Sequence, residues 1–152
     1  MKKALQEAEA AFEKNEVPVG AVIVVGEKVI ARAHNLTETL NDVTAHAEMQ
    51  AFTAAADFLG GKYLKKCTLY VTLEPCQMCA GASYWTQIDQ IVFGAYDPRR
   101  GFQSNETRLH PKTSFIGGVM DKECSDLINR FFIQNRNLNC DRIVVSITVG
   151  LG

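Results

Sequence analysis

Two cysteines at the start of a predicted helix have the spacing of a metal-binding pair. Cys76 and Cys79 stand three residues apart, and Pro75 before them suits a first helical turn, where its missing N–H would lack a partner anyway. Both thiols then lie on one helix face, and the partial positive charge of the helix N-terminus favours the thiolate, which is the form that binds zinc. Redox pairs and buried pairs share this spacing, so the two cysteines alone leave the chemistry open.

A histidine earlier in the chain supplies a third candidate ligand. His46 lies at the start of another predicted helix. Zinc sites with three protein ligands keep a fourth position for water, which is the catalytic arrangement, whereas a structural site takes a fourth protein ligand. The candidates for such a fourth ligand are Cys67, Cys124 and His110. The joint pattern of His46 with the cysteine pair favours a catalytic metal site.

Glu48 is the candidate proton carrier beside this metal. Residues two apart on an ideal helix point about 200° away from each other, so the spacing does not by itself bring Glu48 to His46. The two side chains converge only if the first turn of their helix meets the site end-on. A zinc ion lowers the pKa of its bound water towards about 7, and a neighbouring carboxylate can take the proton and pass it to a substrate. The alternative for Glu48 is an exposed helix glutamate.

Alternating strands and helices must position these residues. Hydrophobic patterns predict strands over residues 19–25, 28–34, 67–73, 90–95 and 113–118, and helices over residues 2–14, 45–58, 75–85 and 121–137. Thr44 is the predicted cap of the second helix. The first two strands should pair antiparallel through a turn at Gly26-Glu27, and the later strands, which helices separate, should run parallel. This order predicts an α/β fold with helices on both faces of a five-stranded mixed sheet.

Composition and charge narrow the classes of protein. The 152 residues suffice for one domain, and 47% hydrophobic with 22% charged residues excludes a disordered chain. The net charge of −1 argues against a protein that wraps long nucleic acid with a strongly basic surface, although it permits a local basic patch. No apolar run approaches the roughly 20 residues of a membrane span, and the N-terminal residues have no signal-peptide core. We therefore expect a cytoplasmic protein without membrane contact, whose five cysteines form no disulfides.

The motif residues resemble those of a known enzyme superfamily. A His-x-Glu sequence followed by Pro-Cys-x-x-Cys is the signature of zinc-dependent base deaminases, the cytidine/deoxycytidylate deaminase superfamily. Within it the chain is most similar to the bacterial tRNA-specific adenosine deaminases. The similarity extends over residues 2–137, and its quoted segments are EVPVGAVIV (16–24), TAHAEMQA (44–51), LYVTLEPCQMCAGA (69–82) and IVFGAYD (91–97).

The resemblance implies a three-layer α/β/α cytidine-deaminase-like fold, a homodimer, and one zinc ion per subunit. It implies His46, Cys76 and Cys79 as zinc ligands and Glu48 as the proton shuttle. The implied reaction is the conversion of adenosine to inosine, with release of ammonia, at the wobble position of a tRNA anticodon loop. Asn35 would contact the target base, and the residues implied to surround the substrate are Pro18, Val19, Ala47, Pro75 and Asp97.

Further candidate RNA contacts are Arg99, Arg100, Phe131 and Phe132. Cationic side chains suit phosphates, although the two arginines could equally belong to a solvated loop and the two phenylalanines to a helix core. Tyr96 stands where some members of the family carry arginine. The chain begins close to its first predicted helix, so we expect a few N-terminal residues of the family to be missing.

The motif is also compatible with two other functions. A deaminase of a free nucleobase or nucleoside, of the guanine or cytosine type, would use the same zinc chemistry, and the near-neutral charge suits a small substrate. A binding module with a purely structural zinc would make Glu48 dispensable.

We assign residues 1–139 to the deaminase-like catalytic domain. Residues 140–152 form a C-terminal tail of unknown role, which is either a strand with a frayed glycine-rich end or a disordered or non-native extension. Cys67, Cys124 and Cys140 are expected to be packing residues.

Overall fold

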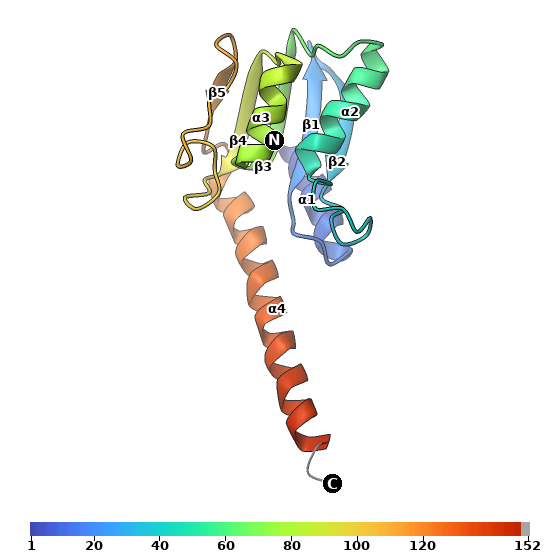
Figure 1. Cartoon of the computed structure of the whole chain (residues 1–152), viewed down its shortest axis with the longest axis vertical. Coiled ribbons are helices and arrows are strands. Elements are labelled where there is room, and N and C mark those ends of the chain that lie inside the picture. Colours follow the sequence, from blue (N-terminus) through green and yellow to red (C-terminus); the bar gives the residue numbers. More distant parts are fainter. Residues whose placement is uncertain (150–152) are drawn as a thin grey trace.

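Nine helices and strands follow one another in the order that the sequence predicts. The computed structural model describes the backbone of residues 1–149 and the side chains as far as residue 138. The helices in this part of the chain are α1 (Lys2–Glu13), α2 (Ala47–Leu59), α3 (Gln77–Thr86) and α4 (Asp121–Val149), and the strands are β1 (Gly20–Val25), β2 (Lys28–His34), β3 (Cys67–Leu73), β4 (Gln90–Ala95) and β5 (Ser114–Ile116). Figure 1 shows them in chain order.

The five strands form one mixed sheet in the order β2-β1-β3-β4-β5. β1 pairs antiparallel with both β2 and β3, whereas β3, β4 and β5 run parallel. The predicted mixed sheet and its strand directions are therefore confirmed. The central strand β3 and its neighbour β4 contribute the fully covered core residues Leu69, Ile91 and Phe93.

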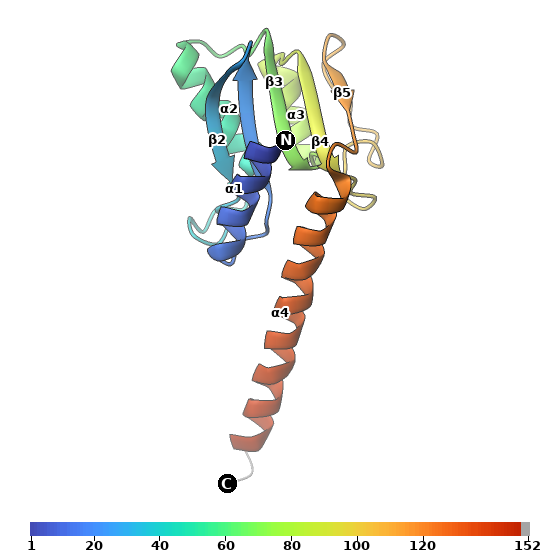
Figure 2. The same ribbon diagram turned by 180° about the vertical axis from the view of Figure 1, so that it is seen from behind.

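Helices cover both faces of the sheet. α2 and α3 contact each other on one face, and α1 packs against β1 on the other, beside the first turns of α4 (Figures 1 and 2). These three layers are the predicted α/β/α architecture. The carboxyl end of β3 leads into α3, and the end of β2 leads through a loop into α2, so both helices begin at the same end of the sheet (Figure 1).

α1 lies unusually close to the sheet. Its buried face consists of Ala4, Ala8 and Ala11. Gly20, the first residue of β1, lies directly beneath this face, and a β-carbon built there would collide with the backbone carbonyl of Ala4 and the backbone nitrogen of Ala8. The absence of a side chain at Gly20 therefore permits the contact between α1 and β1.

Three predicted boundaries are corrected by the structure. α2 begins at Ala47 with His46 as its N-cap residue, whereas Thr44, the predicted cap, directs its hydroxyl and its backbone N–H to Asp42. α3 begins at Gln77, so Pro75 lies just outside the helix. Of the two interpretations of the tail, the strand is wrong, because α4 continues as a helix to Val149. The glycine-rich end, Gly150–Gly152, and the side chain of Cys140 lie outside the described residues.

α4 leaves the sheet after its first turns. Its buried residues Cys124, Leu127 and Phe131 recur at helical spacing and form the face that packs against the domain. The remainder of the helix extends away from the sheet (Figures 1 and 2). Neither α4 nor any other helix in the described part of the chain is apolar enough over its length to cross a membrane.

Candidate active site and metal centre

The three predicted metal ligands come from the N-terminal ends of two neighbouring helices. His46 is the N-cap residue of α2 and Cys76 is the N-cap residue of α3, and both have extended backbone conformations. Cys79 follows in the first turn of α3, where it is fully buried. Because α2 and α3 contact each other, the positive ends of both helix dipoles meet at these residues.

The distances among the ligand atoms fit a zinc ion. The Nδ1 atom of His46 lies 3.6 Å from the Sγ atom of Cys76 and 3.6 Å from that of Cys79. Tetrahedral zinc with bonds of about 2.3 Å to sulfur and about 2.05 Å to nitrogen requires a nitrogen–sulfur separation of about 3.6 Å. Among the residues that the structure describes, these three form the one group with ligand atoms close enough to share a metal ion.

The predicted candidates for a fourth protein ligand lie elsewhere. Cys67 and Cys124 are buried free thiols outside the group, and the ring of His110 stacks edge-on against Tyr84. The arrangement in the described residues is therefore the three-ligand one, which leaves a position for a non-protein ligand.

The pKa values of the two thiols are shifted in opposite directions. The pKa of Cys76 is lowered to about 4, because the thiol of Cys79 donates a hydrogen bond to its sulfur; burial opposes this shift and His46 adds to it. The same hydrogen bond raises the pKa of Cys79, as does its burial, and the hydrogen bond with Cys76 raises the pKa of His46. A thiolate thus stands among the ligands before any metal binds, and metal binding has a proton to displace from Cys79.

Glu48 reaches the ligand group despite its helical spacing. His46 precedes the helix in an extended conformation, so the angular argument for two residues on one helix does not apply to the pair. Glu48 is only 3% exposed in the first turn of α2, and its carboxylate lies within hydrogen-bonding reach of the Cys79 thiol. Burial raises the pKa of Glu48 to about 7. A carboxyl group with this pKa can both accept and donate a proton near neutral pH.

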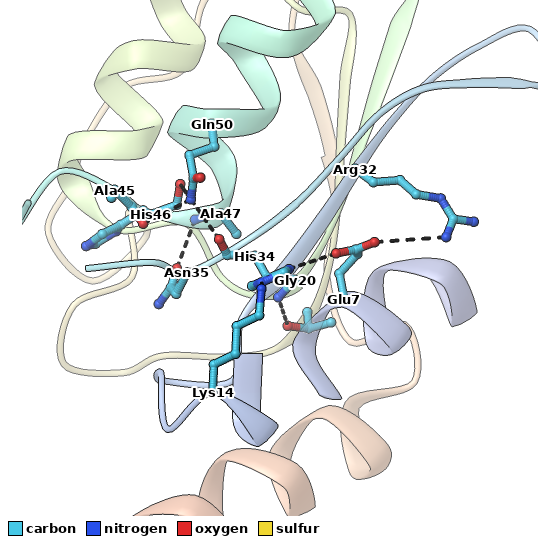
Figure 3. Close-up of polar contacts among 11 residues, drawn as sticks. Glu7, Lys14, Gly20, Arg32, His34, Asn35, Ala45, His46, Ala47 and Gln50 are labelled. Carbon is cyan, nitrogen blue, oxygen red and sulfur yellow. Dashed lines mark hydrogen bonds and ion pairs between the residues drawn. The ribbon is translucent and has the colours of Figure 1, made fainter. Parts of the chain in front are cut away.

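Asn35 is fixed at the end of β2 beside the start of α2. Its backbone N–H donates to the carbonyl of Val19 at 3.1 Å, and its side-chain Oδ1 accepts from the N–H of Ala47 at 2.8 Å. Figure 3 shows the Asn35 side chain pointing to the helix start next to His46. This geometry fixes the amide and directs its Nδ2 donor group away from the bond to Ala47.

Four of the five residues that the resemblance placed around a substrate are buried, and the fifth, Asp97, is half-buried. Pro18 and Pro75 are fully covered, and Val19 and Ala47 are covered to within a few per cent. They belong to the segments that flank Asn35 and the metal ligands. Their contact with a substrate stays a prediction.

A loop after β4 packs against the start of α3. Gly101 forms an isolated bridge with Cys76, and the N–H of Phe102 donates to the carbonyl of Pro75 at 2.9 Å. Within this loop the Oδ1 atom of Asp97 accepts from the N–H groups of Arg99 and Arg100, both at 3.0 Å. The side chains of both arginines are exposed, and Arg100 is near enough to His46 for its charge to oppose, in small part, the rise in the pKa of His46 that the hydrogen bond with Cys76 causes.

The two phenylalanines of α4 have different environments. Phe131 is buried and stacks edge-on against Phe12 of α1, with ring centroids 5.9 Å apart, whereas Phe132 is 47% exposed. Phe131 is thus a packing residue between two helices, and Phe132 alone of the pair presents its ring to solvent. Tyr96 is also exposed at one edge and stacks against Phe93.

Sequence patterns missed three polar residues that hold the site together. Gln50 donates from its side chain to the carbonyls of His34 and Ala45, at 2.7 and 3.2 Å (Figure 3). Glu16 and Glu74 are buried carboxylates that accept hydrogen bonds from loops distant in the sequence. All three lie in segments that carry the family resemblance, and this was the signal that could have found them.

Comparison with known proteins identifies relatives over almost the whole chain. The family model described as MafB19-like deaminase matches residues 1–150. The tRNA-specific adenosine deaminase of Bacillus subtilis (strain 168) is 44% identical over 142 residues, which cover 90% of this chain and 88% of the relative.

Two solved structures bear on the choice of substrate. One, described as a study of A-to-I editing by tRNA:A34 deaminases at the wobble position of transfer RNA, is 41% identical, with a TM-score of 0.76 over 84% of this chain and 96% of that chain. The other is the guanine deaminase of Bacillus subtilis, which is 39% identical, with a TM-score of 0.60 over 62% of this chain and 61% of that chain.

Proposed function

The chain belongs to the MafB19-like deaminase family and to the family of tRNA-specific adenosine deaminases, and from this premise we propose that it converts adenosine to inosine at the wobble position of a tRNA anticodon. The reaction is hydrolytic: adenosine and water give inosine and ammonia. The observation that carries the proposal is the identity of 44% with the Bacillus subtilis enzyme over 90% of this chain. The ligand group beside a buried glutamate supports it.

One zinc ion per subunit is the proposed cofactor, held by His46, Cys76 and Cys79. Their donor set and their separations fit zinc in the three-ligand form. When bound, zinc lowers the pKa of a water in its open position and so makes a nucleophile available near neutral pH. The lowered thiol pKa of Cys76 favours its thiolate, which is the form that binds zinc.

Glu48 moves the protons of the reaction. Its carboxylate takes a proton from the attacking water and delivers it to the ring nitrogen next to C6 as oxygen adds to that carbon. In a second transfer Glu48 carries a proton to the amino group, which leaves as ammonia while the C6 carbonyl of inosine forms. The pKa near 7 that burial gives Glu48 suits a group that must act as base and then as acid.

The target base would be held beside this centre by Asn35. Its Oδ1 already accepts from Ala47, so Nδ2 is the group available to donate to the base. Pro18, Val19, Ala47 and Pro75 would form the walls around it.

The flanking RNA would lie on the loop after β4. In this proposal Asp97 contacts a neighbouring ribose, Arg99 and Arg100 meet phosphates, and Phe132, with Phe131 behind it, approaches the anticodon loop. We expect the enzyme to act as a homodimer in the cytoplasm.

A free nucleobase is the second candidate substrate. The similarity to the Bacillus subtilis guanine deaminase favours it, although that similarity covers 62% of this chain against 84% for the tRNA:A34 deaminase. The near-neutral charge of the chain is also compatible with a small substrate.

A product assay separates the two candidates. Zinc-loaded protein is incubated with an anticodon stem-loop that carries a wobble adenosine and, in parallel, with adenine, guanine, cytosine and their nucleosides. Glu48→Ala serves as the inactive variant, and Glu27→Ala, which alters an exposed turn residue, is its matched control. We expect inosine in the stem-loop reaction alone, a loss of about 100-fold or more in Glu48→Ala with its zinc retained, and no loss in Glu27→Ala.

Other outcomes are equally informative. Turnover of a free base without any inosine in RNA would replace the tRNA proposal with the second candidate and keep the zinc chemistry. Full activity of Glu48→Ala on any substrate would contradict the proton-transfer role and favour a structural zinc.

A further inference from the structure

A buried carboxylate outside the metal group is placed between the two ends of the loop after β4. We infer that Glu74 is a positioning residue, which clamps residues 97–103 and thereby sets the place of Asp97 and the two arginines against the substrate. This inference rests on the proposed function, because the role of that loop as an RNA contact belongs to it.

Glu74 contacts both ends of the loop. Its Oε2 atom accepts from the backbone N–H of Asp97 at 3.0 Å. Its Oε1 atom accepts from the backbone N–H and from the side-chain amide of Gln103, both at 3.1 Å. Because one carboxylate takes donors from the first and the last residue, it fixes the distance between the two ends of the loop.

The clamp is complete without a counter-ion. Glu74 is only 3% exposed, and no lysine, arginine or histidine among the described residues forms an ion pair with it. A buried charge of this kind must be satisfied by hydrogen bonds, and the three N–H groups supply them. Only a carboxylate offers acceptors to all three donors, since an amide in its place would turn an NH₂ group towards one of them.

A second carboxylate, that of Asp97, accepts hydrogen bonds from residues within the loop. Asp97 accepts from the N–H groups of Arg99 and Arg100 through Oδ1, and its carbonyl accepts from the N–H of Gly101 at 2.9 Å. One oxygen of Asp97 is therefore committed to the turn, and Oδ2 is the atom left to meet a ligand. Glu74 determines where this atom lies, because it holds the backbone of the same residue.

Gly101 lets the loop contact both the Glu74 carboxylate and the metal site. A β-carbon at Gly101 would collide with the carboxyl carbon of Glu74, so only glycine permits this approach. The same residue forms the bridge to Cys76. Gly101 of the loop thus contacts both Glu74 and the metal ligand Cys76. These contacts link the proposed RNA-binding residues to the metal centre.

The test is Glu74→Gln in the zinc-loaded protein, with Glu106→Gln as the matched control. Glu106 is an exposed residue just beyond the loop, and its substitution makes the same change of charge. We expect Glu74→Gln to raise KM for the stem-loop about 10-fold, with a smaller change in kcat and unchanged zinc content, because one of the three donors loses its acceptor. Glu106→Gln should leave KM unchanged.

Two further measurements distinguish positioning from general stability. Amide hydrogen exchange over residues 97–103 should become faster in Glu74→Gln while exchange in β3 and β4 stays at the wild-type rate. In an Asp97→Ala background, Glu74→Gln should raise KM by much less than it does alone, because its effect passes through Asp97. Wild-type exchange over the loop, unchanged KM, or a KM effect that adds fully to that of Asp97→Ala would each overturn the inference.

A second variant keeps the test decisive if Glu74→Gln does not fold. Gln103→Leu removes one of the three donors and leaves the carboxylate in place, so we expect a rise in KM of about two- to threefold and faster exchange over the same loop. Wild-type values for both would overturn the inference. The exchange measurement also separates its failure from that of the proposed function, because faster exchange in Glu74→Gln requires no RNA activity.

Discussion

The side-chain amide of Gln50 donates a hydrogen bond to the backbone carbonyl of His34 at 2.7 Å. This contact ties the second turn of α2 to the last residue of β2, directly before Asn35. The same amide donates to the carbonyl of Ala45, directly before His46. One side chain therefore sets the separation between the residue proposed to hold the base and the first proposed metal ligand, as Figure 3 shows.

Substitution of Gln50 by leucine should impair catalysis more than folding. The variant leaves the carbonyls of His34 and Ala45 without this donor, so we expect kcat/KM for the stem-loop to fall about 10-fold, which corresponds to about 1.4 kcal/mol. Initial rates measure the loss. Gln6→Leu, an exposed glutamine of α1, should show none. Equal rates for the two variants would remove Gln50 from the positioning network.

Removal of the metal should abolish activity and lower stability together. A chelator would free His46, Cys76 and Cys79, which come from different helices, so the link between α2 and α3 is lost. At a free metal concentration 100 times the Kd the bound ion contributes about 2.7 kcal/mol, so we expect a clear drop in Tm that zinc reverses. Metal analysis should give one zinc per chain. A metal-free protein with full activity would exclude this cofactor.

Glu16 should make the stability depend on pH in mild acid. Its fully buried carboxylate accepts hydrogen bonds from the N–H groups of Glu38 and Thr39 and from the hydroxyls of Thr37 and Thr39. Burial alone would raise the pKa of Glu16, but these hydrogen bonds outweigh it and lower the pKa below its ordinary value of 4.5. The folded state thus binds this proton more weakly than the unfolded state. Its stabilisation is present above pH 4.5 and is lost as the pH falls through the lowered pKa.

Glu16→Gln measures this contribution. Near pH 7 we expect the variant to be less stable than the wild type by about 1–3 kcal/mol in urea unfolding. The difference should shrink below pH 4.5, where the wild-type carboxylate takes up its proton. Glu27→Gln changes an exposed glutamate and should follow the wild type at every pH. A difference that is constant with pH would mean that the hydrogen bonds do not depend on the charge.

Gly94 should tolerate no side chain. A β-carbon there would collide with the Sγ atom of Cys124 and lie 2.7 Å from the carbonyl oxygen of Thr72. We expect Gly94→Ala to lower the free energy of unfolding by about 1–3 kcal/mol, and Cys124→Ala to relieve part of this loss in a double-mutant cycle. Gly61→Ala, with nothing within 4 Å of its β-carbon, is the control. Additive effects would show that the clash with Cys124 is not what destabilises Gly94→Ala.

The sequence predicts the bounds of three strands to the residue. These are β2, β3 and β4, which are marked in the sequence by segments rich in β-branched and other apolar side chains. The start of α2 differs by two residues, because Asp42 binds the hydroxyl that would have capped the helix. In the tail, residues 143–149 suggested a strand by their β-branched side chains, yet they continue α4, since extension of an existing helix adds a hydrogen bond per residue.

The candidate site also has features that the sequence predicts and features that it does not. The motif predicts the ligand group, because its residue types and spacing carry the chemistry. The approach of Glu48 to His46 could not be predicted, since it depends on His46 standing outside the helix. The hydrogen bonds of Glu74 and Gln50 join segments that the sequence separates, and a single glutamate or glutamine leaves no periodic signal.

The close contact between Gly20 and α1 joins the first helix to several distant parts of the molecule. α1 lies against the sheet through alanine methyl groups, and it also contacts β2, β3 and α4. A local opening of α1 would therefore release contacts well beyond the helix itself. Glu16 follows α1, and Phe12 within it packs on Phe131 of α4. Loss of the first helix would thus free both the segment that leads to His46 and the first turns of the last helix. Damage on the face of the sheet opposite the metal site would in this way reach the metal site.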